Sequence, residues 1–124
     1  MVSPIADIII RKGVEHVDTA KLAPELRRTV LEEAGTTLQK LGRHREAALA
    51  FTIAESAKLR EAVAYYAQAG LFSVAAEYAR HLEDVAELER VAAENLRLGN
   101  REEALRLYRK AGNGQMVRFI EENL

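Results

Sequence analysis

The sequence predicts an all-α protein, an α-α superhelix of about three stacked antiparallel helix hairpins with a capping helix at each end. Three observations favour this fold class. A glycine recurs at intervals of 28 and 29 residues, as Gly42, Gly70 and Gly99, and an alanine follows each glycine after five positions. Apolar residues recur at helical spacing on both sides of every glycine. Helix-forming alanine, glutamate, arginine and leucine dominate a chain with only two prolines.

The recurring glycine and alanine each have a structural interpretation. Glycine adopts the left-handed conformation that closes a helix, so each glycine is expected to end the first helix of a hairpin. Ala47, Ala75 and Ala104 are expected early in the second helix, where two tightly joined helices leave little room for a side chain. One hairpin cannot bury its own apolar face, so neighbouring hairpins are expected to stack.

The same pattern predicts the helix boundaries and the domain organisation. Ser3 and Pro4 are typical of a helix start, and Asp84 with Glu87 and Asn100 with Glu103 predict capping boxes. No linker interrupts the chain, which predicts a single domain over 1–124, with repeats at 24–57, 58–83 and 84–111 and caps at 1–23 and 112–124. The predicted helices cover 4–16, 24–41, 44–57, 59–68, 72–82, 85–98, 101–111 and 115–123.

The first hairpin has a small residue, a large residue, an alanine, an aromatic residue and an alanine in a characteristic order, as Gly35, Leu38, Ala47, Phe51 and Ala54. In this order it resembles a tetratricopeptide repeat. The later hairpins match the signature less completely. The period is also shorter than the family's roughly 34 residues, and the proline that usually ends the second helix is missing. These departures bring the chain closer to the looser hairpin solenoids of clathrin-like coat proteins.

The resemblance implies a concave face built by the first helix of each hairpin. Small side chains at its centre would let another helix approach, and basic residues would pair with an acidic rim of that helix. Glu32 and Glu89 stand where family members that grip a peptide carboxylate carry a basic residue, so such a clamp is not expected. The residues expected to bind a partner are Thr36, Gln39, Lys40, Arg60, Ala64, Ala67, Gln68, Glu89, Ala93 and Arg97.

The function that follows is a scaffold for protein interaction or assembly, which binds a peptide or helix on an alanine-rich groove. The simpler alternative is that the alanines are only helix formers on a solvated face. A second alternative is an RNA-binding helical repeat, because Arg101, Arg106 and Arg109 follow the third glycine. The net charge of −1 makes nucleic acid an unexpected partner.

A third alternative is a homo-oligomeric accessory subunit of a larger complex. Ile5, Ile8 and Ile9 share one face of the first predicted helix, whereas Ile10 points away from it. A helix that is apolar on more than one side is usually buried on more than one side. Ile10 is therefore expected to contact a second subunit.

No catalytic or metal-binding motif is evident, so the chain is predicted not to be an enzyme and to need no cofactor. His16, His44 and His81 are far apart in the sequence and there is no cysteine. The absence of cysteine and of a long apolar segment leads us to expect a cytoplasmic protein without membrane contact.

Overall fold

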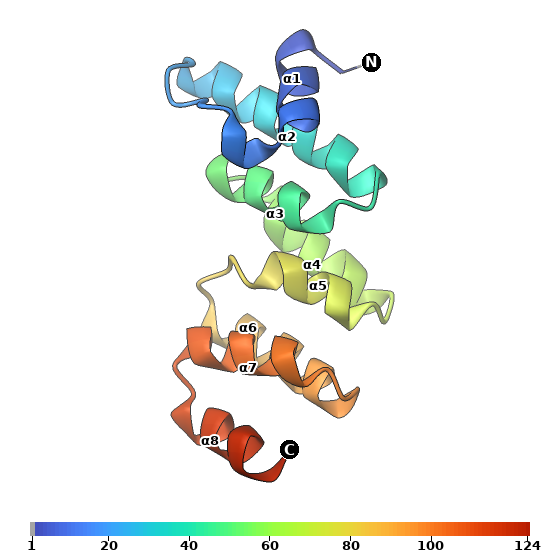
Figure 1. Cartoon of the computed structure of the whole chain (residues 1–124), viewed down its shortest axis with the longest axis vertical. Helices are drawn as coiled ribbons and strands as arrows, with labels where there is room; N and C mark the ends of the chain where they lie inside the picture. The colour runs from blue at the N-terminus through green and yellow to red at the C-terminus, as the bar shows by residue number, and fades with distance from the viewer. Residues whose placement is uncertain (1) are drawn as a thin grey trace. The chain divides into compact units, whose positions relative to one another are not determined.

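The computed structural model describes residues 2–124, and within them the chain forms eight α-helices and one short 3₁₀ helix (Figure 1). Within each unit, helices that follow one another in the sequence pack together. The all-α prediction is therefore confirmed. The chain divides into two compact units, the first ending at Leu59 and the second running from Arg60 to Leu124, so the boundary falls inside helix α4 (Lys58–Gln68).

In unit 1, α1 packs on α2 and α2 packs on α3, while the 3₁₀ helix η1 contacts α1 and α3. Ser3 starts this arrangement as predicted, because its hydroxyl accepts a hydrogen bond from the Ala6 amide at 3.2 Å. The Ser3 amide donates to the Glu33 carboxylate at 2.6 Å and thereby ties α1 to α2. Hydrogen bonds from the Ser3 side chain and amide lower the pKa of Glu33. The elements are α1 (Pro4–Lys12), η1 (Val14–His16), α2 (Pro24–Lys40) and α3 (His44–Ile53).

In unit 2, α5 packs on α6 and α7, α6 forms a tight hairpin with α7, and α8 packs on α7 (Figure 1). Asp84 caps α6 as predicted, since its carboxylate accepts a hydrogen bond from the Glu87 amide at 3.1 Å. The elements after α4 are α5 (Phe72–Ala79), α6 (Val85–Arg97), α7 (Arg101–Ala111) and α8 (Gly114–Asn123).

The three recurring glycines close helices in the way that the sequence predicted. Gly42, Gly70 and Gly99 have φ angles of 77°, 79° and 83°, all in the left-handed region. In each case the amide of the next residue bonds to a carbonyl five residues earlier, as in Arg43 to Leu38 at 2.9 Å. Atoms of the chain lie more than 4 Å from the place of a Cβ at each glycine, so the requirement for glycine is one of backbone conformation.

The alanines five positions later are buried, and one glycine of α2 is required for space. Ala47, Ala75 and Ala104 have no exposed surface. Gly35 lies against the buried Phe51 of α3, where a Cβ would stand 2.4 Å from a ring carbon. The packing of α2 on α3 therefore depends on a residue without a side chain at position 35.

Three helices end earlier than the sequence predicted. The segments 4–16, 44–57 and 72–82 are helical only to Lys12, Ile53 and Ala79. Gly13 has a φ of 98° and turns the chain into η1. Glu55, although not a glycine, has a φ of 52° and closes α3. Arg80 ends α5, and the next bonds are of the shorter 3₁₀ type.

Two further expectations are corrected. Ile10 does not face outward, since it is only 9% exposed. Ile8, at 39%, is the more exposed residue. Asn100 makes no side-chain cap on α7, and its side-chain amide donates to Asn95 at 3.0 Å.

Replacement of Gly35 tests the packing of α2 on α3. Gly35→Ala is expected to lower the free energy of unfolding by about 1–3 kcal/mol, because the new methyl group would overlap the ring of Phe51. Gly114→Ala is the control, since its Cβ would enter open space at the start of α8. Thermal melts compare the two. Equal stability of both variants would show that position 35 has room for a side chain.

Candidate functional site

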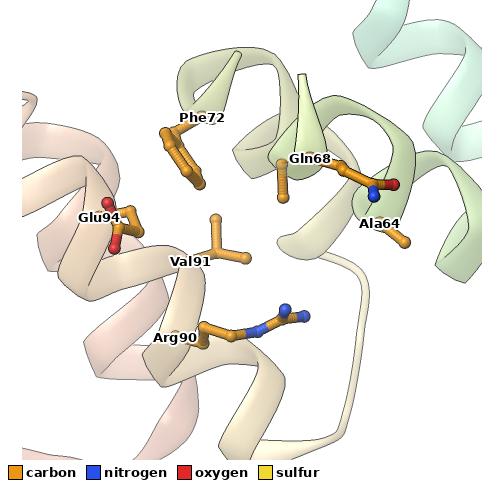
Figure 2. Close-up of a pocket in the computed structure, with 7 residues that line it drawn as sticks. Ala64, Gln68, Phe72, Arg90, Val91 and Glu94 are labelled. Atoms are coloured by element: carbon orange, nitrogen blue, oxygen red, sulfur yellow. The ribbon is translucent and has the colours of Figure 1, made fainter. Parts of the chain in front are cut away.

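A pocket of about 440 Å³ opens in unit 2 between α4, the first residue of α5 and α6 (Figure 2). In Figure 2, Phe72 and Val91 point into this space from different helices, and Arg90 extends along its edge. The volume lies within the range of about 300–1,000 Å³ that is typical of ligand pockets. We call it the α4/α6 groove, and its lining residues are Ala64, Ala67, Gln68, Phe72, Arg90, Val91 and Glu94.

Helix α4 is held so that its alanines face the groove. Ala64, Ala67 and Gln68 are three and four residues apart, so they share one side of the helix. Next to them, Tyr66 stacks on the buried Tyr78 of α5, with ring centroids 5.5 Å apart and planes 15° from parallel. This contact turns the Tyr66 side of α4 toward α5. The alanine side is thereby left toward the pocket.

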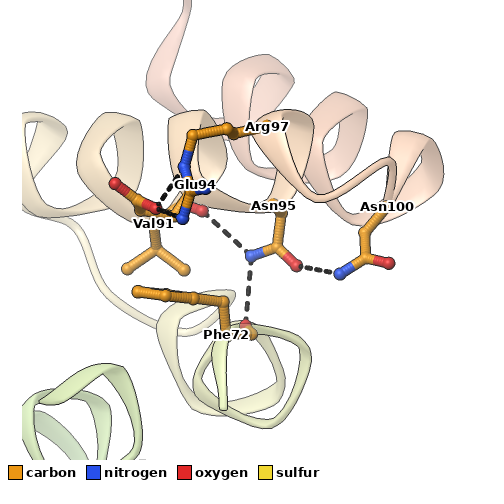
Figure 3. A network of polar contacts seen from close by, with 6 residues as sticks. All are labelled: Phe72, Val91, Glu94, Asn95, Arg97 and Asn100. Atoms are coloured by element: carbon orange, nitrogen blue, oxygen red, sulfur yellow. Dashed lines mark hydrogen bonds and ion pairs between the residues drawn. The ribbon is translucent and has the colours of Figure 1, made fainter. Parts of the chain in front are cut away.

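A buried polar network holds Phe72 at the groove (Figure 3). Asn95 of α6 has no exposed surface, and its side-chain amide donates to the Phe72 carbonyl at 3.1 Å and to the Val91 carbonyl at 2.9 Å. Its side-chain oxygen accepts the hydrogen bond from Asn100. A buried amide with partners for both of its ends favours a single arrangement of the chain. Asn95 therefore ties the start of α5 to α6.

One end of the α4/α6 groove is crossed by an ion pair. Arg60, one turn before Ala64, lies 3.1 Å from Glu87 of α6 and 4.0 Å from Asp84. Arg90 shares the same Glu87 at 4.0 Å. Two guanidinium groups thus converge on one carboxylate. Toward the C-terminal end of α6, Arg97 and Glu94 form a closer ion pair, in which Arg97 donates two hydrogen bonds to Glu94, at 2.7 and 3.0 Å.

The basic partners of these pairs are more exposed than the acidic ones. The side chains of Arg60 and Arg90 are each 60% exposed and that of Arg97 is 65% exposed. The carboxylates beneath them are more covered, with 23% for Glu87 and 35% for Glu94. Although the local charges nearly balance, the outer rim of the groove therefore presents guanidinium groups to solvent.

The structure places the predicted partner-binding residues in different surroundings. Ala64, Ala67 and Gln68 line the groove, and Arg60 and Arg97 belong to the ion pairs described above.

The remaining predicted residues lie elsewhere. Glu89 accepts a hydrogen bond from Asn113, which caps α8, and Ala93 is exposed. Thr36 and Gln39 in unit 1 are half-buried, whereas Lys40 is exposed.

The residues of α6 in the groove were not predicted from the sequence, and geometry explains why. The partner-binding residues were predicted at equivalent positions in the first helix of each hairpin. A groove between two helices uses opposite flanks of them, so α6 contributes Arg90, Val91 and Glu94. Counted back from the glycine of each hairpin, Arg90 and Glu94 stand three residues earlier than Ala64 and Gln68. At about 100° per residue, they therefore lie about 60° around the helix from the positions equivalent to Ala64 and Gln68.

Phe72 and Asn95 could have been found as departures from the repeat. Phe72 stands two residues after its glycine, where the other hairpins have His44 and Arg101. Asn95 stands four residues before its glycine, where the others have Leu38 and Tyr66. An apolar residue at a polar position and an amide at an apolar position both indicate a contact that the other hairpins do not make.

The basic residues that suggested RNA binding are paired with acidic ones. The pairs join α7 to its own first residues, to α8 and to the segment before α6, which is the usual pattern of a solvated helix surface. They are Arg101–Glu102 at 3.1 Å, Arg106–Glu103 at 4.0 Å, Arg109–Glu121 at 2.9 Å and Lys110–Glu83 at 3.6 Å.

Unit 1 has a polar pocket of about 400 Å³ beside Arg43 and the turn at Gly13. The Arg43 guanidinium donates to Glu46 at 2.8 and 2.9 Å and to the Ile10 carbonyl near the end of α1 at 3.1 Å. The hydrogen bond to Glu46 raises the pKa of Arg43. Its polar groups thus serve to join α3 to α1.

Over residues 2–124, no group of three or more histidine, cysteine or acidic side chains is arranged to hold a metal ion. None of the helices in this range combines the length and apolar character needed to cross a bilayer.

Comparisons of the chain with family models, with characterised proteins and with solved structures find no significant match. What the chain binds must therefore be inferred from the geometry of its own residues.

Replacement of Asn95 tests the network behind the groove. Asn95→Ala is expected to lower the free energy of unfolding by about 1–3 kcal/mol, because the Phe72 carbonyl and the Asn100 amide would lose their partner. Asn123→Ala is the matched control, since it removes an amide bonded to the Phe119 carbonyl on the exposed side of α8. Urea unfolding compares the variants. Equal losses would show that the buried network adds no stability.

Proposed function

We propose that the protein is a tetratricopeptide-like interaction module whose α4/α6 groove binds an amphipathic helix of a partner protein. The observation that carries the proposal is the groove itself, whose floor is formed by small residues of α4, the half-buried Phe72 and the buried Val91. Such a floor suits an apolar side chain on a helix that lies between α4 and α6.

The shape of the groove favours a helix over an extended peptide. Both walls are α-helices, whose backbone amides and carbonyls are bonded within the helix. A strand added to such a wall would find few backbone partners. A helix has satisfied its own backbone bonds, so it needs only apolar contact and side-chain pairing. Ala64 and Ala67 allow its close approach.

The resemblance to tetratricopeptide repeats is supported by packing as well as by sequence. Gly35 lies against Phe51 at the family's small and aromatic positions, and Ala47, at the family's alanine position, is fully buried. Superhelical stacking of the three hairpins stays a prediction. The RNA-binding alternative is less favoured, because the arginines of α7 are already paired with acidic residues.

Site-specific photo-crosslinking tests this function. A photoreactive residue introduced as Ala64→p-benzoylphenylalanine is expected to capture a defined set of proteins from the native extract, because the probe stands inside the groove. Filling the groove with a second change, Ala67→Trp, is expected to lower the yield several-fold.

The control is Glu102→p-benzoylphenylalanine on α7, where the side chain is 73% exposed. Capture of the same proteins from that position, or an unchanged yield in the filled variant, would contradict binding in the groove.

A further inference from the structure

Helix α8 presents an apolar side chain that its own unit covers only by about half. The helix packs on α7 through the fully buried Ile120, and Glu121 is paired with Arg109 of α7 at 2.9 Å. Phe119 is nevertheless 52% exposed. Aromatic residues are enriched in the cores of protein interfaces, so Phe119 has the chemistry of an apolar anchor.

An exposed carboxylate accompanies Phe119 on the same side of α8. Glu122 follows it by three residues, so the two side chains are neighbours, separated by about 4.5 Å along the helix axis. Glu122 is exposed and has no ion-pair partner among residues 2–124. The outer side of α8 thus carries an apolar anchor and, one turn later, a free negative charge.

The α4/α6 groove has the complementary pair of features. Phe72 and Val91 form an apolar floor, and next to Val91 the Arg90 guanidinium is exposed and lies 4.0 Å from a carboxylate that it shares with Arg60. Arg90 can therefore turn to a new carboxylate without breaking a close hydrogen bond. An aromatic anchor on the floor would leave an acid one turn away within reach of Arg90.

We propose that the α4/α6 groove of one copy receives α8 of a second copy. Phe119 lies over Phe72 and Val91, and Glu122 pairs with Arg90. This inference rests on the proposed function of the groove and names its occupant.

The contact is between two different surfaces of unit 2, so it is heterologous. Heterologous contacts build open chains or rings of copies, unless two copies exchange their helices reciprocally and close as a dimer. One helix in one groove buries a small area, so the association is weak. It is also sensitive to salt, because an exposed ion pair contributes to it.

A charge swap followed by light scattering of the full chain tests the pairing. Association of the parent is expected to rise with protein concentration. Arg90→Glu alone and Glu122→Arg alone are each expected to weaken association by about tenfold or more, because each places like charges opposite one another. The double variant, with both changes in one chain, is expected to recover to within about threefold of the parent, because the pair is restored with opposite orientation.

Matched controls separate this pairing from a general effect of charge. Arg106 on α7 lies 4.0 Å from Glu103, the same distance and spacing as Arg90 and Glu87, so Arg106→Glu is expected to leave association unchanged. Phe119→Ser is expected to abolish association. Circular dichroism of each variant shows that its helices are retained.

A parent that stays monomeric at every concentration overturns the inference, and so does a double variant that associates no better than the single ones. These outcomes are distinguishable from failure of the proposed function. If the chain is monomeric while the Ala64 probe captures other proteins, the groove binds a different helix and only the second copy is excluded. If the Ala64 probe captures nothing, neither another protein nor a second copy, the groove has no binding function.

Discussion

The left-handed turn at the end of each first helix is the constraint on which the rest of the structure depends. Gly70 closes α4 in this way, and the amide of Leu71 then bonds back to Tyr66 at 2.8 Å. The following residue, Phe72, is thereby the first residue of α5 and stands at the groove. At Gly99 the same turn brings Asn100 to Asn95, whose amide holds the Phe72 carbonyl. The turns that make the hairpins therefore also place the groove's aromatic side chain.

Much of the fold could be predicted, because the recurring glycines are required by backbone conformation and the recurring alanines by the close approach of two helices. Only glycine takes a φ near 80° without strain, and only a small residue fits where two helices meet, so both leave a regular trace in the sequence. The ends that were predicted wrongly lack such a trace. Glu55 closes α3 with a positive φ angle, which glutamate does not favour, so the residue type gives no indication of a helix end there. Gly13 lies outside the period of the repeat.

The candidate site could be predicted only in part, for two physical reasons. The face of α4 follows from helical spacing, which correctly groups Ala64, Ala67 and Gln68. Which flank of α6 meets that face depends on how the helices pack, and spacing within one helix carries no such information. Asn95 depends on a contact across 23 residues of sequence, so no local pattern indicates its partner, Phe72. The only sequence feature that indicated Phe72 and Asn95 was that each differs in type from the residues at the same position of the other two hairpins.

The most direct test of the α4/α6 groove as the site that receives α8 of a second copy is amide chemical-shift mapping with two complementary variants. The labelled chain carries Phe119→Ser, and the unlabelled chain carries Ala67→Trp, so only the labelled groove and the unlabelled α8 are free to meet. On titration, the account predicts shifts at the amides of Ala64, Phe72 and Val91. Shifts confined to unit 1, or none at saturating concentration, would contradict it.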